Sequence, residues 1–443
     1  MLSQVYVDGF KSLTKFTLDL QPGLNILVGP NGSGKTNIIS FFEFLGNLQD
    51  MSISDAISKA GGAGSIFTKV GENQYRSNLI CSVTGNIKIG PKKIIFYRYS
   101  FTISIDDSFE SIIYEKQRLE VKYRTVTTKS NAIPKDMDLD VMVNMNSSSD
   151  KPSTKIQVLD LKKITLRYIG QSAKSETNKN RIIEELITER VGADESLVEC
   201  ARMAFEDFMF ISNDLHGGKV YNVVPSRART PEDSAKAPGI DSDGSGLYAT
   251  LYAIKKHEKQ PKKRTIFMPR MRSTFSSKVT LANILSYTQL ANGSISQIDV
   301  QNNPFDNQLQ IRIGIGEEDK STILPLSSMS DGTIKWLSLI TIILTTRFIY
   351  SVEEPENYLH PLMQSEILKV MRDSVCGERF ILLSTHSETL LNNATPEEVI
   401  VVAFRDGRTI ANRPSNGPEL SREIRETGFG LGYYYISGSL DNE

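Results

Sequence analysis

A glycine-rich stretch near the start of the chain has the composition and spacing of a phosphate-binding loop. Its residues fit the pattern G-x-x-x-x-G-K-[ST], in which backbone N–H groups surround the phosphates of a nucleotide. In such a loop Lys35 reaches the β- and γ-phosphates, and the Thr36 hydroxyl joins the coordination shell of Mg²⁺. The predicted phosphate-binding set is Gly29, Asn31, Gly32, Ser33, Gly34, Lys35 and Thr36. The alternative is a Gly/Ser turn in which Ser33 or Thr36 caps a helix.

The flanking sequence favours the phosphate loop over the simple turn. Leu24 to Val28 is a short apolar run typical of a buried strand, and Ile38, Phe41, Phe42 and Leu45 recur at helical spacing. The loop is therefore expected between a strand and the N-terminus of a helix. Unpaired N–H groups and a partial positive charge at that end of a helix attract anions.

Two adjacent carboxylates, Glu353 and Glu354, end a second apolar segment. In a nucleotide hydrolase one carboxylate anchors the Mg²⁺ shell, and the next takes a proton from the attacking water. Taken alone, the pair is better explained as the start of a helix with Pro355 in its first turn. Phe380 to Ser387 adds another apolar segment, which ends in His386. A lone histidine is more often structural, but open parallel sheets bind ligands at the carboxyl ends of their strands.

The composition of the chain excludes several classes of protein. Its 443 residues are enough for two or three domains, and 39% hydrophobic with 23% charged residues is a globular composition. A net charge of −1 gives no global attraction to nucleic acid or membrane. Three cysteines without C-x-x-C spacing predict neither a disulfide framework nor a thiolate metal site, and a reducing cytoplasm is expected. No apolar stretch is long enough to span a bilayer, so no membrane partner is expected.

The remaining segments alternate between strand-like and polar character. A strand-rich start is predicted at Val5 to Leu20, and an antiparallel meander at Asn78 to Arg124. Lys129 to Thr154 is rich in Asn, Ser and Asp and is predicted to be a surface loop or linker. Arg181 to Phe210 has helical periodicity. The one basic concentration, Lys255 to Arg272, is most simply a solvated face.

Several segments together resemble the ABC-type ATPases of the RecF, SMC and OLD-like kind. They are GFKSL, GPNGSGKT, DGSGLYATLYAI, LSSMSDGT, VEEPENYLHP and LLSTHS, and they cover most of residues 1–110 and 200–410. The resemblance implies an α/β fold: an ABC-type ATPase head with a mixed N-terminal sheet, a parallel-stranded phosphate-loop core and a central insertion. The expected parts are an N-terminal head segment at 1–110, an insertion of strands, polar loop and helices at 111–240, and a C-terminal lobe at 241–443.

The same resemblance implies ATP and Mg²⁺ as cofactors and a role for each motif. Gly29 to Thr36 match Walker A, Glu353 and Glu354 match Walker B, and His386 matches the switch histidine. Glu354 and His386 would then be catalytic, and Thr36 and Glu353 would hold the metal. Most members have Asp where this chain has Glu353.

A further set of residues is implied to act at the contact with a second subunit. Ser330 and Gly332, in the signature segment, would complete the site around ATP held by the other head, and Asp331 replaces the usual first glycine. Asn357, after Walker B, and Lys11, in GFKS, are candidate extra contacts. Gln171 is a weak candidate for the Q-loop residue.

The resemblance implies an ATPase whose nucleotide-driven head dimerisation senses or gates a partner effector. Similar stand-alone ATPases work in bacterial antiviral systems such as Septu, PARIS and retron-linked modules, so a separate nuclease or toxin is the expected partner. No nuclease chemistry is expected in this chain, because the segment after His386 is too short for a metal-binding domain. The alternative is a RecF-like DNA-binding ATPase of repair or recombination, with DNA contacted through Lys255 to Arg272. A transporter ATPase is disfavoured by the signature variant and the missing Q-loop.

Overall fold

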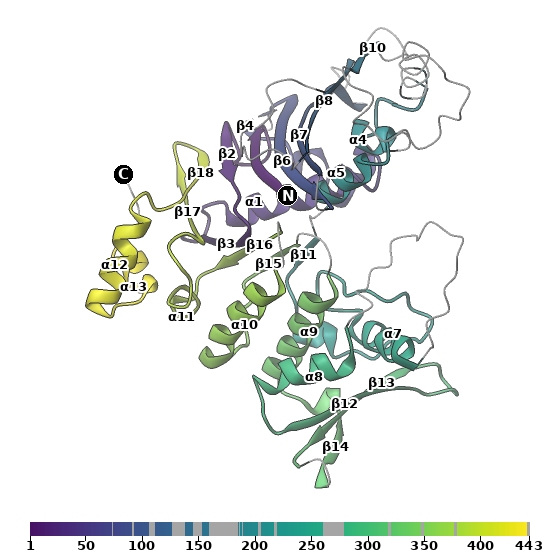
Figure 1. Ribbon diagram of the computed structural model, residues 1–443, viewed down its shortest axis with the longest axis vertical. Coiled ribbons are helices and arrows are strands. Elements are labelled where there is room, and N and C mark those ends of the chain that lie inside the picture. Colours follow the sequence, from purple (N-terminus) through teal and green to yellow (C-terminus); the bar gives the residue numbers. More distant parts are fainter. Residues whose placement is uncertain are drawn as a thin grey trace.

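The structure, a computed structural model, is built around two large β-sheets with helix α1 between them (Figure 1). It describes residues 1–72, 74–90, 93–105, 111–125, 138–144, 153–158, 185, 187, 189–202, 205–216, 219–259, 279–317, 320–346, 350–375 and 379–440.

The first sheet is antiparallel and has seven strands in the order β10-β9-β8-β7-β6-β1-β2. The strands are β1 (Leu2–Asp8), β2 (Phe16–Asp19), β6 (Asn78–Ile89), β7 (Lys93–Ile105), β8 (Ile112–Thr125), β9 (Leu139–Asn144) and β10 (Ser153–Val158). The predicted strand-rich start and the antiparallel meander are confirmed, since β6, β7 and β8 pair in sequence. The predicted domain boundary at residue 110 falls between β7 and β8, which are neighbours in this sheet. The division into parts stays a prediction.

Two predictions about the middle of the chain are wrong. The segment predicted as a polar loop contains β9, whose residues Leu139, Val141 and Val143 face the core and pair with β8. The periodic stretch at 181–210 is no continuous helix in its described part. Its residues 189–196 form turns and irregular chain, which separate helical residues 185 and 187 from α4 (Leu197–Ala201) and the start of α5 (Phe208–Leu215). The carbonyls of Ala193 and Asp194 accept hydrogen bonds from distant backbone N–H groups, which draws this segment out of a helix.

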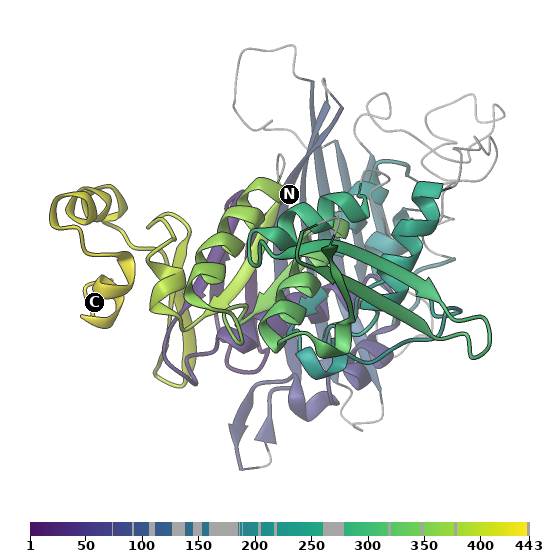
Figure 2. The ribbon, with the colours of Figure 1, turned by 90° about the horizontal axis from the view of Figure 1, so that it is seen from below.

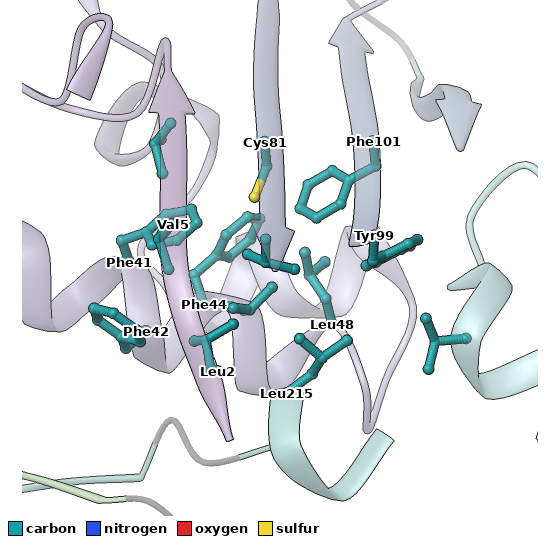
Figure 3. Packing of buried hydrophobic residues seen from close by; sticks show 14 of the residues in the cluster. Leu2, Val5, Phe41, Phe42, Phe44, Leu48, Cys81, Tyr99, Phe101 and Leu215 are labelled. Atoms are coloured by element: carbon teal, nitrogen blue, oxygen red, sulfur yellow. The ribbon is translucent and has the colours of Figure 1, made fainter. Parts of the chain in front are cut away.

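Helices cover the inner face of the first sheet and form the first core cluster. Figure 3 shows Phe41 and Phe44 of α1 (Lys35–Asn47) close to the strands that carry Val5 and Cys81, with Leu215 of α5 in the same cluster. Short helix α2 (Ile53–Lys59) packs here too. The apolar stripe read from the sequence of α1 is thus buried against this sheet.

The second sheet carries the phosphate loop and is parallel except at one edge. Its order is β11-β15-β16-β3-β17-β18, and only β17 and β18 pair antiparallel. The strands are β3 (Gly23–Val28), β11 (Lys219–Tyr221), β15 (Tyr350–Glu353), β16 (Phe380–Thr385), β17 (Val399–Arg405) and β18 (Arg408–Asn412). The α/β class with a mixed sheet and a parallel core around the phosphate loop is confirmed.

The central strands of the second sheet are buried on both faces. Leu27 and Leu382 belong to the first core cluster, whereas Ile26 and Leu383 belong to a second one. The second cluster is made largely with α9 (Asp331–Thr345) and α10 (Pro361–Ser374). Such burial on both faces explains the continuous apolar runs from which these strands were predicted.

The rest of the described chain surrounds the second cluster and the edge of the second sheet. Figures 1 and 2 show α7, α8 and a small three-stranded sheet next to α9, and the C-terminal helices beyond β17 and β18. These elements are α6 (Pro225–Ala228), α7 (Leu247–Lys259), α8 (Leu281–Gln289), β12 (Ile295–Asn302), β13 (Leu309–Ile315), β14 (Thr322–Pro325), α11 (Glu388–Leu391), α12 (Gly417–Thr427) and α13 (Leu431–Ile436). The described helices include none with the length and hydropathy of a membrane span.

Candidate functional site

The phosphate loop lies between β3 and α1, as its flanks predict. Gly32 and Gly34 have φ values of 79° and 106°, in the left-handed region that favours glycine, and Gly34 is the N-cap residue of α1. A Cβ built at Gly34 would lie 2.0 Å from Thr409 Oγ1 on β18. A Cβ at Gly29 would lie 2.1 Å from the Val402 carbonyl oxygen on β17. Strands β17 and β18 therefore press on the loop so closely that only glycine fits at these two positions.

Lys35 is folded against its own loop. Its Nζ donates hydrogen bonds to the carbonyl oxygens of Gly29 and Pro30, at 2.8 and 3.0 Å. Burial lowers the pKa of Lys35, while the negative charges of Glu354 and Glu356 act in the opposite direction. The side chain is thus a buried cation among carboxylates, in reach of any anion that the loop holds.

The parallel register brings polar side chains of β11 and β15 together at one edge of the sheet. Tyr221 of β11 pairs with Val352 of β15, so the next residues, Asn222 and Glu353, come side by side. The pKa of Glu353 is raised chiefly by burial and then by the adjacent charge of Glu354, and the nearby polar side chains of Asn222 and Thr36 oppose this effect.

Glu354 comes directly after β15 and faces the switch-type histidine. Its φ of 43° is unusual for a residue with a Cβ. The Glu354 carboxylate lies 3.7 Å from His386 Nε2 and accepts a hydrogen bond from Asn357 Nδ2 at 2.8 Å. The Glu354 backbone N–H donates to the carbonyl of Ser384, at 3.0 Å, on the neighbouring strand β16. The two strand ends therefore hold the Glu354 carboxylate and the His386 imidazole close to each other.

His386 is itself held by a third carboxylate. Glu356 Oε1 accepts a hydrogen bond from the His386 backbone N–H at 2.8 Å and another from Thr385 Oγ1 at 2.7 Å. Glu356 is 9% exposed. It fixes the turn that follows β16, and so the direction in which His386 leaves the strand.

These groups line a cavity of about 310 Å³. Its walls are Asn31, Gly32, Gly34, Lys35, Thr36, Asn37, Asn222, Glu353, Glu354, Ser384 and His386. Eight of the residues predicted for the site from sequence therefore meet in one cavity. Gly29 and Ser33 belong to the same loop without lining the cavity.

The donor set fits a nucleotide phosphate with a divalent cation. The glycine loop leaves room for an anion, Lys35 supplies a positive charge, and the Ser33 hydroxyl is buried without a hydrogen-bond partner among the described residues. Oxygen ligands are those that Mg²⁺ prefers, and Thr36 and Glu353 supply a hydroxyl and a carboxylate to the wall of the same cavity. These two residues would hold Mg²⁺.

The signature segment lies outside this cavity. Ser330 is the N-cap of α9, and its hydroxyl accepts a hydrogen bond from the Thr333 N–H at 3.3 Å. A Cβ at Gly332 would lie 2.8 Å from the carbonyl oxygen of Tyr358, in the loop after Glu354. Asp331 accepts a hydrogen bond from Arg229 Nη2 at 2.6 Å. The structure thus groups the signature with the loop after Walker B and apart from the phosphate cavity of the same chain.

The other predicted residues have varied positions. Lys11 does not line the cavity, and its backbone has a φ of 48°. Burial lowers the pKa of Lys11, while the negative charges of Glu43 and Glu353 act in the opposite direction. Within the basic stretch, Lys255 forms an ion pair with Asp299. Residues 260–272 of that stretch and Gln171 lie outside the described part of the chain.

Four residues of the site were missed from sequence. Asn37 is next to a predicted motif, and Ser384 and Glu356 are inside motifs, so a closer reading of those motifs could have found them. Asn222 follows a strand of three residues and meets Glu353 only through the pairing of β11 with β15. Nothing in the local sequence marks that contact.

Two protein-family models divide most of the chain between them. A family described as AAA ATPase domain matches residues 1–213. A second family, described as AAA domain, putative AbiEii toxin, Type IV TA system, matches residues 216–392. The chain is therefore similar to ATPase domains on both sides of its middle.

Curated relatives match only a short segment. "DNA replication and repair protein RecF" of Psychromonas ingrahamii is 44% identical over 45 residues, which are 10% of this chain and 12% of that protein. RecF of Aliivibrio fischeri is 39% identical over 46 residues, 10% of this chain and 13% of that protein. The matched segment thus spans about an eighth of these relatives.

Solved structures of SMC heads align over most of the chain at low identity. An SMC head bound to the C-winged helix domain of ScpA is 13% identical with a TM-score of 0.49, covering 93% of this chain and 97% of that one. The SMC head domain from Thermotoga maritima is 11% identical with a TM-score of 0.40, covering 93% and 98%. The family models are the comparison that bears on function, and they show a chain similar to ATPase domains over both its halves.

Proposed function

We propose that this chain binds ATP with Mg²⁺ and hydrolyses it in the cavity between the phosphate loop and the ends of β15 and β16. The observation that carries the proposal is the meeting of Lys35 and Thr36 with Glu353, Glu354 and His386 around one cavity. Mg²⁺, when bound, supplies positive charge that neutralises the phosphate oxygens. The similarity of residues 1–213 and 216–392 to AAA-type ATPase domains supports the same reaction.

In this proposal, different residues of the chain have different roles in phosphoryl transfer to water. Lys35 and the loop N–H groups bind and orient the phosphates, because the loop and Lys35 line the cavity at the N-terminus of α1. Glu354 accepts a proton from the attacking water, and Asn357 and His386 fix the direction of its carboxylate. His386 also has a position from which it can contact the γ-phosphate.

A second copy of the chain completes the site in this proposal. Ser330 and Gly332 do not line the cavity of their own chain, yet they lie at the start of a helix whose N–H groups can hold an anion. Two heads packed around two nucleotides would place each signature segment on the phosphates held by the other head. Binding of ATP then drives dimerisation.

The dimer is proposed to gate a separate effector, a nuclease or toxin. The match of residues 216–392 to a family whose description includes a putative AbiEii toxin supports an effector-linked role, as does the resemblance to stand-alone ATPases of antiviral systems. The second candidate is a RecF-like DNA-binding ATPase, which the 45-residue similarity to RecF favours.

Light scattering after size exclusion tests the dimerisation step. Glu354→Gln with ATP and Mg²⁺ should elute with twice the mass of the same variant without nucleotide, since the bound ATP is no longer consumed. Lys35→Ala should keep the mass of the nucleotide-free protein under both conditions. A Glu354→Gln variant that binds ATP and keeps one mass with and without it would contradict head dimerisation.

A further inference from the structure

A lysine without solvent exposure lies in the second core cluster, near the beginning of α9. Lys335 is 0% exposed, and its Nζ donates a hydrogen bond to the carbonyl oxygen of Val223 at 2.9 Å. Removing an ammonium group from water is costly, and an apolar side chain of similar volume is often at least as stabilising in such a place. A buried lysine that bonds a single carbonyl therefore calls for a reason beyond packing.

The carbonyl that Lys335 holds belongs to the residue that follows Asn222 of the cavity wall. Val223 directly follows Asn222, which lines the cavity and lies beside Glu353 through the pairing of β11 with β15. The Lys335–Val223 bond joins segments that are 112 residues apart in the sequence. It therefore fixes the backbone beside Asn222, the neighbour of the first Walker B carboxylate in the cavity wall.

Two carboxylates near the cavity act on the charge of Lys335. Burial lowers the pKa of Lys335, and the negative charges of Glu356 and Glu354, in that order, oppose this effect. Glu356 Oε1 is used by Thr385 and by the His386 backbone, while its Oε2 is buried and has no hydrogen-bond partner among the described residues. A buried carboxylate of this kind needs nearby positive charge, and Lys335 and Lys35 are both cations on whose pKa the charge of Glu356 acts.

We propose that Lys335 and Glu356 are positioning residues that couple the signature end of α9 to the phosphate cavity of the same chain. Ser330 caps α9 five residues before Lys335, which is about 7.5 Å along the axis of a rigid helix. A contact made at Ser330 by nucleotide on a second copy shifts α9, and Lys335 passes that shift to Asn222 and, through Glu356, to the turn that carries His386. The phosphate cavity of each head would thereby respond to whether the signature segment of that head contacts nucleotide on the second copy. This inference rests on the proposed ATPase function.

Kinetics of Lys335→Met test the coupling, because methionine keeps the length of the side chain and removes its charge. We expect its affinity for ATP to stay within about threefold of wild type while kcat falls at least about tenfold, the pattern of a lost interaction that matters only for turnover. The matched control is Lys369→Met on α10, where the lysine is exposed and pairs with Glu366 at 2.7 Å. The control should retain the wild-type kcat.

A second readout follows α9 directly and does not need turnover. Trp336 is the one tryptophan of the chain; it is 0% exposed and donates from Nε1 to the Tyr287 carbonyl oxygen at 3.0 Å. Saturating ATPγS with Mg²⁺ should change its fluorescence emission in wild type and in Lys369→Met. In Lys335→Met the change should be lost, although calorimetry shows that the nucleotide binds.

The double variant Lys335→Met/Glu356→Gln covers the case in which the single variant does not fold. Removing both charges leaves no uncompensated carboxylate, so the double variant should recover the thermal midpoint without recovering kcat or the Trp336 response. A folded single or double variant with wild-type kcat and a wild-type Trp336 response would overturn the coupling and leave the ATPase proposal intact. A wild-type protein that binds no ATP would overturn the proposed function, and the coupling with it.

Discussion

Glu354 has a backbone conformation that costs energy, in a place where its carboxylate is directed toward His386. Residues with a Cβ at a φ of 43° persist where the surrounding structure enforces them, and such positions cluster at functional sites. Here the Glu354 N–H bond to Ser384 and the Asn357 contact enforce it. We therefore expect Glu354→Gln to slow ATP hydrolysis by roughly 10²–10⁴, the usual worth of a general base.

The measurement for Glu354→Gln is phosphate release, compared with binding of a fluorescent ATP analogue. Binding should be unchanged, because glutamine keeps the size of the side chain and its hydrogen bond from Asn357. A Glu354→Gln variant that hydrolyses ATP at the wild-type rate would show that another residue is the base.

Glu353 illustrates a conflict between stability and metal binding at the same site. Burial and the adjacent charge of Glu354 raise the pKa of Glu353, which means that its ionised form is disfavoured in the folded protein. Glu353→Gln removes this cost, so the thermal midpoint without nucleotide should rise by roughly 1–3 °C near neutral pH. Differential scanning fluorimetry with ATP, with and without Mg²⁺, should also show that the variant loses the extra stabilisation due to the metal. An unchanged Mg²⁺ effect would exclude Glu353 as a metal ligand.

At the scale of elements, helix α9 joins the packed core to the site. Lys335 has a pKa lowered to about 8 from an ordinary value of 10.5. Between these values the unfolded chain binds more protons than the folded one, so the unfolding free energy contributed by this group rises as the pH rises. Below about pH 8 the cost of holding the charged lysine is fully present.

Urea unfolding of wild type and Lys335→Met at several pH values measures this contribution. The stability of wild type relative to the variant should increase between pH 8 and pH 10 and be independent of pH below that window. A difference between the two proteins that stays constant from pH 7 to pH 10 would show that Lys335 titrates at its ordinary pKa.

Elements with a local signal were predictable from the sequence, and elements that depend on distant partners were not. The strand before Gly29 and the helix after Thr36 each show their own periodicity, and both are present. β9 is a strand of six residues inside an Asn- and Ser-rich stretch, where the composition hid the alternation of Leu139, Val141 and Val143. The 181–210 stretch has helical spacing, but hydrogen bonds from Ile53 and Tyr114 pull part of it into turns.

At the scale of the whole molecule, the site is assembled from both ends of the chain. Its motifs could be predicted because each has a fixed spacing, and Glu356 lies inside one of them. Asn222 could not be predicted, because its place in the site depends on the pairing of neighbouring parallel strands. The contacts of Ser330 and Gly332 with nucleotide bound to a second copy of the chain remain predictions from the resemblance to ABC-type ATPases.

The basic stretch decides between the two whole-molecule functions. We expect reversal of Lys256, Lys262, Lys263 and Arg264 to leave DNA binding and its salt dependence unchanged, because the chain has a net charge of −1 and Lys255 is already ion-paired. Lys255 itself is left intact to preserve its bond to Asp299. A log–log salt slope that flattens by about 0.9 for each lost duplex contact would instead favour the RecF-like function. Fluorescence anisotropy with duplex DNA at several salt concentrations makes this measurement.

The central claim is that this cavity hydrolyses ATP, and steady-state phosphate release from ATP and Mg²⁺ tests it most directly. Wild-type protein should release phosphate, and Lys35→Ala, which removes the one cation of the phosphate loop, should not. The exposed-surface variant Lys369→Met should match wild type, which shows that replacing a lysine elsewhere does not abolish phosphate release, while the loss in Lys35→Ala excludes a contaminating activity. The absence of phosphate release by wild type at concentrations that permit dimerisation, or equal release by wild type and Lys35→Ala, would contradict the account.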